Sequence, residues 1–220
     1  MELLVFGHAG TPTLMFPVTQ GRFYDYENSG TVGALESKIN AGQLQLFCVD
    51  SVDNESWFNR GVHPHERVRR QVTYEEYILQ EVLPLIRGIN GAETITATGC
   101  GLGGYQSVNL TLRHPDVVAA CVSMSGIFDL KPLMEGYYDE DFYLNNPVDY
   151  LPNTTDLFIL KRYAKLRLIL GVGNRDPSLS DNKSLAQALA TKHVPAWLDV
   201  WSGGEPEGWA LWRGMAVKFL

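Results

Sequence analysis

The chain has 220 residues, with 18 lysines and arginines against 25 aspartates and glutamates, so its formal net charge is −7 at pH 7. The length fits one domain over residues 1–220, because single cores grow to roughly 250 residues before chains tend to split. The acidic balance argues against non-specific binding to nucleic acid or to an anionic membrane, and a hydrophobic content of 45% argues against intrinsic disorder.

The sequence also indicates where the protein resides. The first residues, Met1–Phe6, carry neither a basic segment nor a small-residue cleavage site, so we expect no secretory signal. The apolar runs are far shorter than the ~20 residues that a membrane span needs. Three cysteines do not make a disulfide framework. We therefore expect a cytoplasmic protein; the sequence leaves its oligomeric state open.

Short apolar runs alternate with amphipathic stretches along the chain. The predicted strands are Leu3–Phe6, Thr13–Pro17, Leu44–Val49, Thr94–Thr98, Ala119–Met124, Leu166–Gly171 and Ala196–Trp201. The predicted helices are Thr31–Asn40, Thr73–Arg87, Gly104–His114, Leu179–His193 and Trp209–Leu220. Continuous apolar runs are typical of strands buried on both faces. The alternation predicts an α/β fold with a mostly parallel sheet and helices on both faces.

One segment does not follow this alternation. Residues 128–156 are rich in Tyr, Asp, Asn and Pro and show no clear periodicity. We predict an irregular, lid-like insertion over the C-terminal edge of the sheet, where such folds place their sites.

The most informative segment is the turn after the fourth predicted strand, which reads Gly99-Cys100-Gly101-Leu102-Gly103 and leads into a helix. A strand, a tight turn of small residues and a helix form the setting of the G-x-S-x-G nucleophile elbow, in which a strained turn exposes a serine. Here Gly101 stands where that serine is expected.

These residues, with several other segments, resemble the α/β-hydrolase superfamily and, within it, the esterase D-like group of esterases. The similar segments are Phe16-Pro17, Gly21–Tyr24, Cys48–Asp53, Ser56-Trp57, Gly99–Gly104 and Arg113–Asp116. The resemblance covers nearly the whole chain and implies an α/β-hydrolase fold. It also implies carboxylesterase chemistry through a triad in the chain order Ser, Asp or Glu, His.

The triad implied by this resemblance is altered in the chain. Asp176 follows the penultimate strand and occupies the position of the acid, with Asp181 as a less favoured alternative. Glu207 stands where the resemblance implies histidine, and no histidine follows His193. Without a serine hydroxyl and an imidazole, an acyl-enzyme cannot form by the usual route. We therefore expect a poor serine esterase.

The remaining site candidates would bind the substrate or stabilise an oxyanion. The resemblance implies the Leu102 N–H as one oxyanion donor, with a second donor from Gln20 or Thr19 in the loop after an early strand. Gln106, where relatives often have histidine, is a further candidate beside the elbow. An ordinary turn at residues 17–22 is the competing interpretation.

Aromatic residues surround the altered position in the predicted site. Trp57 and Trp209 lead a larger set of candidates that includes Phe58, Tyr137, Tyr138, Trp201 and Trp212. Apolar walls raise the pKa of a carboxylate, so Glu207 could act as a general base that abstracts a proton from a flat, apolar substrate.

Three interpretations of the altered site remain open. The paired changes at Gly101 and Glu207 fit a deliberately engineered esterase scaffold with a new base. They also fit a natural, catalytically silent homologue that binds a small molecule or a partner. In the third interpretation, Glu207 is a solvated loop carboxylate without a function in the site. In the first two, the expected partner is a small molecule.

Four other motifs are interpreted as structural. The pattern from Gly99 to Gly104 matches G-x-G-x-x-G, but the next strand does not end in the acidic residue that a dinucleotide site needs, so we expect no cofactor. His63-Pro64-His65 lacks a third ligand and is predicted to be a surface loop rather than a metal site. Arg67–Arg70 is expected to cap a helix or pair with Glu75, Glu76 and Glu81. Cys100, Ser123 and Ser125 are predicted to be buried or capping residues at strand ends.

Overall fold

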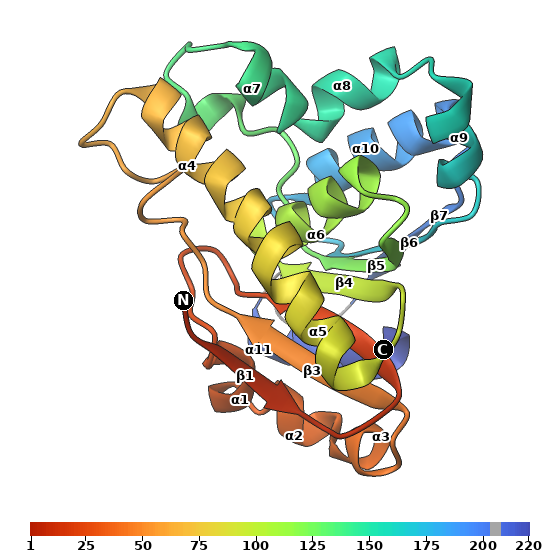
Figure 1. The fold of residues 1–220 in the computed structure, drawn as a ribbon. Coiled ribbons are helices and arrows are strands. Elements are labelled where there is room, and N and C mark those ends of the chain that lie inside the picture. Colours follow the sequence, from red (N-terminus) through yellow and green to blue (C-terminus); the bar gives the residue numbers. More distant parts are fainter. Residues whose placement is uncertain (203–207) are drawn as a thin grey trace.

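The computed structural model describes residues 1–202 and 208–220 and contains a seven-stranded sheet in the order β1-β3-β2-β4-β5-β6-β7 (Figure 1). The strands are β1 (Leu3–Phe6), β2 (Thr11–Phe16), β3 (Leu44–Val49), β4 (Ile95–Cys100), β5 (Val118–Met124), β6 (Arg167–Gly173) and β7 (Ala196–Trp201). Only β1 is antiparallel to its neighbour, β3. The predicted α/β fold with a mostly parallel sheet is confirmed.

Helices cover both faces of the sheet. On one face lie α4 (Pro64–Tyr77), the π-helical turn η1 (Ile78–Val82), α5 (Leu83–Asn90), α6 (Leu102–Arg113) and α10 (Leu179–Thr191). On the other lie α1 (Asp25–Asn28), α2 (Thr31–Ala34), α3 (Glu36–Asn40) and α11 (Trp209–Phe219). No helix in the described part of the chain has both the length and the apolar character to span a bilayer.

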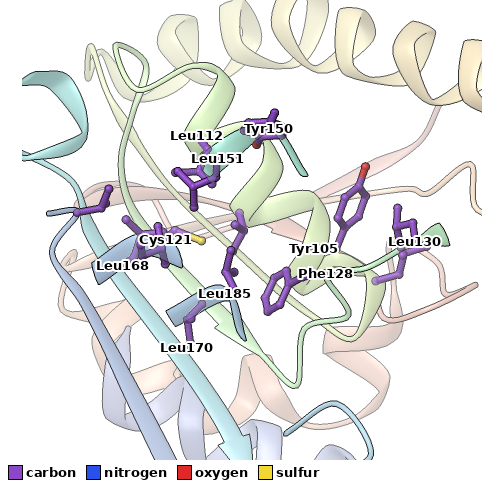
Figure 2. Close-up of a cluster of buried hydrophobic side chains, with 14 of the residues drawn as sticks. Tyr105, Leu112, Cys121, Phe128, Leu130, Tyr150, Leu151, Leu168, Leu170 and Leu185 are labelled. Carbon is purple, nitrogen blue, oxygen red and sulfur yellow. The ribbon is translucent and has the colours of Figure 1, made fainter. Parts of the chain in front are cut away.

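Successive strand side chains supply the cores on opposite faces. Leu168 and Leu170 of β6 share one core with Leu185 of α10 and with residues of α6 (Figure 2). Ile169, between them in sequence, belongs to the core under α11 on the other face. β6 is therefore apolar on both faces, as is typical of a parallel strand between two layers of helices.

The predicted helices that differ most from the structure are the first two; the other three agree to within two residues at each end. The helix predicted at Thr31–Asn40 is two short helices, α2 and α3, with Leu35 between them outside helical geometry. The helix predicted at Thr73–Arg87 begins at Pro64 instead. The predicted surface loop at His63-Pro64-His65 is therefore wrong: the His63 side chain caps α4 by accepting from the His65 N–H, and Pro64 occupies the first turn.

The segment 128–156 is not irregular, which corrects the prediction. It contains η2 (Lys131–Leu133), α7 (Glu140–Leu144) and α8 (Pro147–Asn153), and α9 (Leu157–Tyr163) follows it. Asp139 caps α7 by accepting from the Phe142 N–H. Phe128 and Phe142 are fully buried in the core above α6. Short helices with N-caps leave little hydrophobic periodicity to detect, so the sequence pattern missed them.

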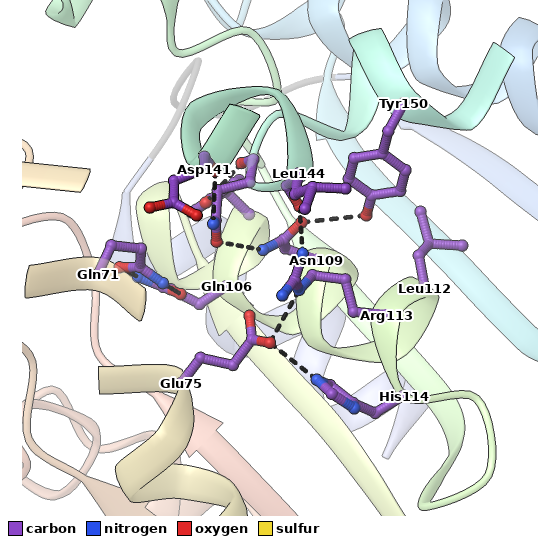
Figure 3. Close-up of polar contacts among 12 residues, drawn as sticks. Gln71, Glu75, Gln106, Asn109, Leu112, Arg113, His114, Asp141, Leu144 and Tyr150 are labelled. Carbon is purple, nitrogen blue, oxygen red and sulfur yellow. Dashed lines mark hydrogen bonds and ion pairs between the residues drawn. The ribbon is translucent and has the colours of Figure 1, made fainter. Parts of the chain in front are cut away.

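The basic run at Arg67–Arg70 also differs from its prediction. The buried Arg67 guanidinium donates to the Leu133 carbonyl oxygen and to Glu135, tying α4 to η2. Glu75, an expected partner of this run, instead accepts from Arg113 and lies 2.8 Å from His114 Nε2 (Figure 3). Burial would raise the pKa of Glu75, but these two partners hold it below its ordinary value.

Candidate functional site

The turn between β4 and α6 has the backbone of a nucleophile elbow. Gly101 has φ 57° and ψ −120°, and its N–H donates to the Met124 carbonyl oxygen. This positive φ suits glycine and strains other residues. At Gly103, a Cβ would overlap the Pro17 carbonyl oxygen and lie 2.7 Å from the Phe16 carbonyl oxygen. Glycine at this position therefore lets α6 approach the end of β2.

Thr19 occupies the space beside the elbow. Its Oγ1 accepts a hydrogen bond of 2.9 Å from the Leu102 N–H, the group proposed as an oxyanion donor. A Cβ built on Gly101 would lie 2.6 Å from the same Oγ1. The Thr19 hydroxyl therefore takes up both the first oxyanion donor and part of the room that a side chain at position 101 would need.

A cavity of about 670 Å³ opens above the elbow at the C-terminal edge of the sheet. Its described lining residues are Val18, Thr19, Gly101, Ser125, Ile127, Asp176, Pro177, Ser178, Asp181, Gly208, Trp209 and Trp212. The cavity thus brings together Gly101, Asp176 and Trp209, three of the residues singled out from the sequence.

Asp176 lies in the turn after β6 and is 5% exposed. Its Oδ1 accepts from the Ser178 backbone N–H at 2.8 Å and from the Ser178 hydroxyl at 2.7 Å. Its buried Oδ2 has no hydrogen-bond partner among the residues that the structure describes. A buried acceptor without a partner is costly, so this oxygen marks a place where a donor would be stabilising.

Asp181, the alternative acid, lies in the cavity wall in the first turn of α10. Its Oδ2 accepts from the backbone N–H groups of Phe128 and Asp129, at 3.2 and 3.4 Å. Asp181 therefore anchors the chain where the segment 128–156 begins, and it also adds a second carboxyl group to the lining.

Two indoles form the aromatic side of the cavity. The rings of Trp209 and Trp212 are nearly perpendicular, with centroids 5.4 Å apart, and Trp209 packs edge-on against Tyr26. Trp212 Nε1 donates to Ser125 Oγ at 2.8 Å. Ser125 has a positive φ of 52°, an uncommon conformation for serine that points to a constrained strand end.

Three predicted site residues lie elsewhere. The Gln20 N–H donates to Asp53 Oδ2 at 2.8 Å, so it is not free to act as an oxyanion donor. Gln106 forms a reciprocal amide pair with Gln71, with both hydrogen bonds at 2.8 Å (Figure 3). Trp57 is 1% exposed and packs against Tyr105 and Phe142 in the core, not at the cavity. In each case the side chain or N–H group is already bonded to, or packed against, a residue distant in sequence.

Glu207 lies outside the described residues. Its neighbours Gly208 and Trp209 line the cavity.

Neither Cys100 nor Ser123 offers a replacement nucleophile. Cys100 is fully buried, and burial raises the pKa of its thiol to about 12 while Tyr26 Oη donates to its sulfur. A thiol that keeps its proton at neutral pH is a poor nucleophile. Ser123 is fully buried, and its Oγ has no partner among the described residues, so it does not cap the backbone as predicted.

Sequence reasoning missed the side-chain role of Thr19 and the place of Ser125, Ile127 and Ser178 in the wall. Ser178 lies two residues after Asp176, and a serine two residues after an aspartate can form a local hydrogen-bonded turn, which was the one available signal. Nothing local predicts Thr19, because its partner, Leu102, lies 83 positions away.

A family model described as "Putative esterase" matches residues 28–214, and no curated protein matches the chain. The fold is similar to that of a ferulic acid esterase, with a TM-score of 0.77 and 17% identity over 99% of this chain and 90% of the other. An S-formylglutathione hydrolase from Agrobacterium tumefaciens has a TM-score of 0.72 and 11% identity, covering 98% of this chain and 86% of the other. MPT51 (FbpC1) of Mycobacterium tuberculosis has a TM-score of 0.69 and 12% identity, covering 98% of this chain and 89% of the other. At these identities the similarity establishes the fold alone.

Proposed function

Because the chain belongs to the esterase family whose model covers residues 28–214, we propose that its cavity binds a small molecule but no longer supports the serine-esterase reaction. The observation that carries this proposal is the arrangement of Gly101, Thr19 and Leu102. The elbow keeps its backbone shape, has no side chain to attack a carbonyl carbon, and has its Leu102 N–H bound to a threonine hydroxyl.

The proton-transfer groups support the same proposal. An esterase serine needs a base to take its proton, and that base is oriented by a carboxylate. Asp176 is held by Ser178, and no histidine is among the described residues that line the cavity. The cavity is nevertheless retained, with a volume in the range of small-molecule sites.

The proposal is tested by hydrolysis of 4-nitrophenyl acetate and butyrate. The unmodified chain is expected to stay at the background rate, and Gly101→Ser/Glu207→His to hydrolyse both esters. Adding Thr19→Ala to this double variant should increase its kcat at least about tenfold. Thr19→Ala frees one oxyanion donor, and removal of one such donor typically lowers kcat by about 10²–10³-fold. The added change also removes the oxygen that a Cβ at position 101 would meet at 2.6 Å.

Thr19→Ala alone is the matched control, and it should leave the rate at background because no nucleophile is present. Ester hydrolysis by the unmodified chain, at a rate comparable to that of the double variant, would contradict the proposal. Labelling of the unmodified chain by a fluorophosphonate probe would contradict it equally, since that reagent reports an activated hydroxyl.

We propose a second candidate activity for the same cavity, with Glu207 as a general base that abstracts a proton from an activated carbon acid. The observation that favours it is that the next two residues, Gly208 and Trp209, line the cavity together with Trp212. A carboxylate beside indole walls is less solvated, which raises its pKa and its strength as a base.

The probe for this activity is 5-nitrobenzisoxazole, whose ring opens when its C–H proton is removed. Turnover by the unmodified chain should be saturable and should fall at least about 100-fold in Glu207→Gln, since general-base catalysis contributes typically 10²–10⁴. Glu205→Gln is the matched loop control and should keep the rate. Equal rates in all three proteins would rule out Glu207 as the base.

A further inference from the structure

The cavity has an unsatisfied acceptor in its wall. Asp176 is 5% exposed, and Ser178 supplies both donors to Oδ1, while Oδ2 has no partner among the described residues. A buried carboxylate oxygen without a donor is destabilising until a donor or a cation reaches it. Oδ2 itself has almost no exposed surface, so a donor on a ligand would reach it only when neighbouring atoms of the wall shift, although the Asp176 side chain belongs to the cavity lining.

The charged side chains among the described lining residues all have one sign. Asp176 and Asp181 are the two ionisable groups among the described lining residues, which include no lysine, arginine or histidine. The donors to the Asp181 carboxyl within the described part of the chain are two backbone N–H groups, which carry no net charge. An anionic ligand would meet repulsion at this wall, and a cationic ligand would meet attraction that is strengthened by the apolar surroundings.

The remaining walls suit an apolar cation. The rings of Trp209 and Trp212 pack edge to face, with centroids 5.4 Å apart, so a ligand would lie against this pair of rings and not between them. Indole is the aromatic ring that attracts cations most strongly. Val18, Ile127 and Pro177 add an apolar surface, and Gly101 contributes no side chain that would reduce the space.

From these observations we infer that the ligand of this cavity is an organic ammonium, a protonated amine on an apolar body. The ammonium group lies against the Asp176 carboxylate, whose Oδ2 it reaches once the covering atoms shift, and within the field of Asp181, and the body packs against Trp209 and Trp212. This inference rests on the proposed function, because it names the class of small molecule that the cavity binds.

The test uses three probes with the same body and different head groups: 4-phenylbutylamine, 4-phenylbutanol and 4-phenylbutyrate. Their binding to the unmodified chain is measured by isothermal titration calorimetry at pH 7, where the primary amine is charged. The amine is expected to bind at least about tenfold more tightly than the alcohol, and the carboxylate more weakly than both, because charge-assisted hydrogen bonds are the stronger ones.

Two variants locate the effect. Asp176→Asn should reduce the preference for the amine over the alcohol about tenfold while the alcohol binds as before. Asp116→Asn removes an exposed carboxylate that pairs with Arg162 at the opposite edge of the sheet, and it should leave the preference unchanged. Thermal unfolding of both variants checks that they fold. The comparison of head groups on the unmodified chain does not depend on either variant.

Equal affinity for the three probes, tighter binding of the carboxylate, or no binding of the amine would each overturn the ammonium inference. The same is true of an amine preference that survives in Asp176→Asn. The proposed function is judged separately by the ester experiment. A chain that hydrolyses esters through an activated hydroxyl would fail that experiment whatever its head-group preference.

Discussion

Gly103→Ala is expected to lower the free energy of unfolding by about 3 kcal/mol or more, although glycine to alanine in a helix usually stabilises. The reason is the close contact between the first turn of α6 and the end of β2. A Cβ on Gly103 would overlap the Pro17 carbonyl oxygen and crowd that of Phe16, and backbone atoms of a buried strand end cannot rotate out of the way. The helix must move, and Leu102 moves with it.

Urea unfolding followed by far-UV circular dichroism measures this loss. Gly88→Ala is the matched control: Gly88 also lies inside a helix, α5, but nothing lies within 4 Å of the position that a Cβ would take there. That control should be stabilised by about 0.5–1 kcal/mol. If both variants have the same stability, the tight packing at the elbow is not a constraint on this fold.

Asp53→Asn is expected to remove a large part of the pH dependence of stability between pH 4 and 7. Asp53 is 2% exposed, and burial raises its pKa from 3.8 to about 7, partly offset by the hydrogen bond from the Gln20 N–H. Between these values the unfolded chain releases the proton and the folded chain keeps it. Ionisation thus favours the unfolded state, and the contribution to stability present below pH 4 is lost as the pH rises to 7.

The loss from this one group is at most about 4 kcal/mol, because each tenfold difference in proton affinity is worth about 1.4 kcal/mol. Asparagine keeps an oxygen to accept from the Gln20 N–H but has no proton to release. Relative to the unmodified chain, Asp53→Asn should therefore be little changed at pH 4 and most stabilised at pH 8, as measured by urea unfolding at each pH.

Asp116→Asn, on the exposed surface, serves as the reference for this comparison and should shift stability by at most about 0.5 kcal/mol at every pH. The explanation is refuted if Asp53→Asn and the unmodified chain lose stability in parallel between pH 4 and 7. That result would mean that Asp53 is ionised at the same pH in the folded and unfolded states.

Much of the sheet was predictable because its strands are short, mostly apolar runs; β3 is buried throughout, whereas β7 at the sheet edge has no fully buried residue. Leu44–Val49 and Ala196–Trp201 have the predicted bounds, since an apolar run between polar turns is a local property of the chain. The bounds of β4 were less accurate: it extends to Cys100 because Cys100 pairs with Met124 of β5, and such pairing is not a local property. The same limit applies to α7 and α8, whose helices depend on caps and on packing above α6.

The candidate site was predictable where a residue's position follows from its place at the end of a strand or the start of a helix. The C-terminal ends of parallel strands meet at one edge, so the turns after β4 and β6 bring Gly101 and Asp176 to the same cavity. Trp209 joins them at the start of α11. Trp57 and Gln106 had no such constraint, and the fold directs them to Tyr105 and to Gln71 instead.

The sequence by itself determined the α/β alternation, the glycines of the elbow and the absence of a serine at position 101. Each of these is a property of consecutive residues, set by hydrophobic pattern and backbone conformation. Only the tertiary structure decided that Thr19 meets the Leu102 N–H, that Gln20 is held by Asp53, and that Asp176 keeps an oxygen without a partner among the described residues. Those pairings join segments that are brought together only when the strands assemble, and burial then determines which polar groups find partners.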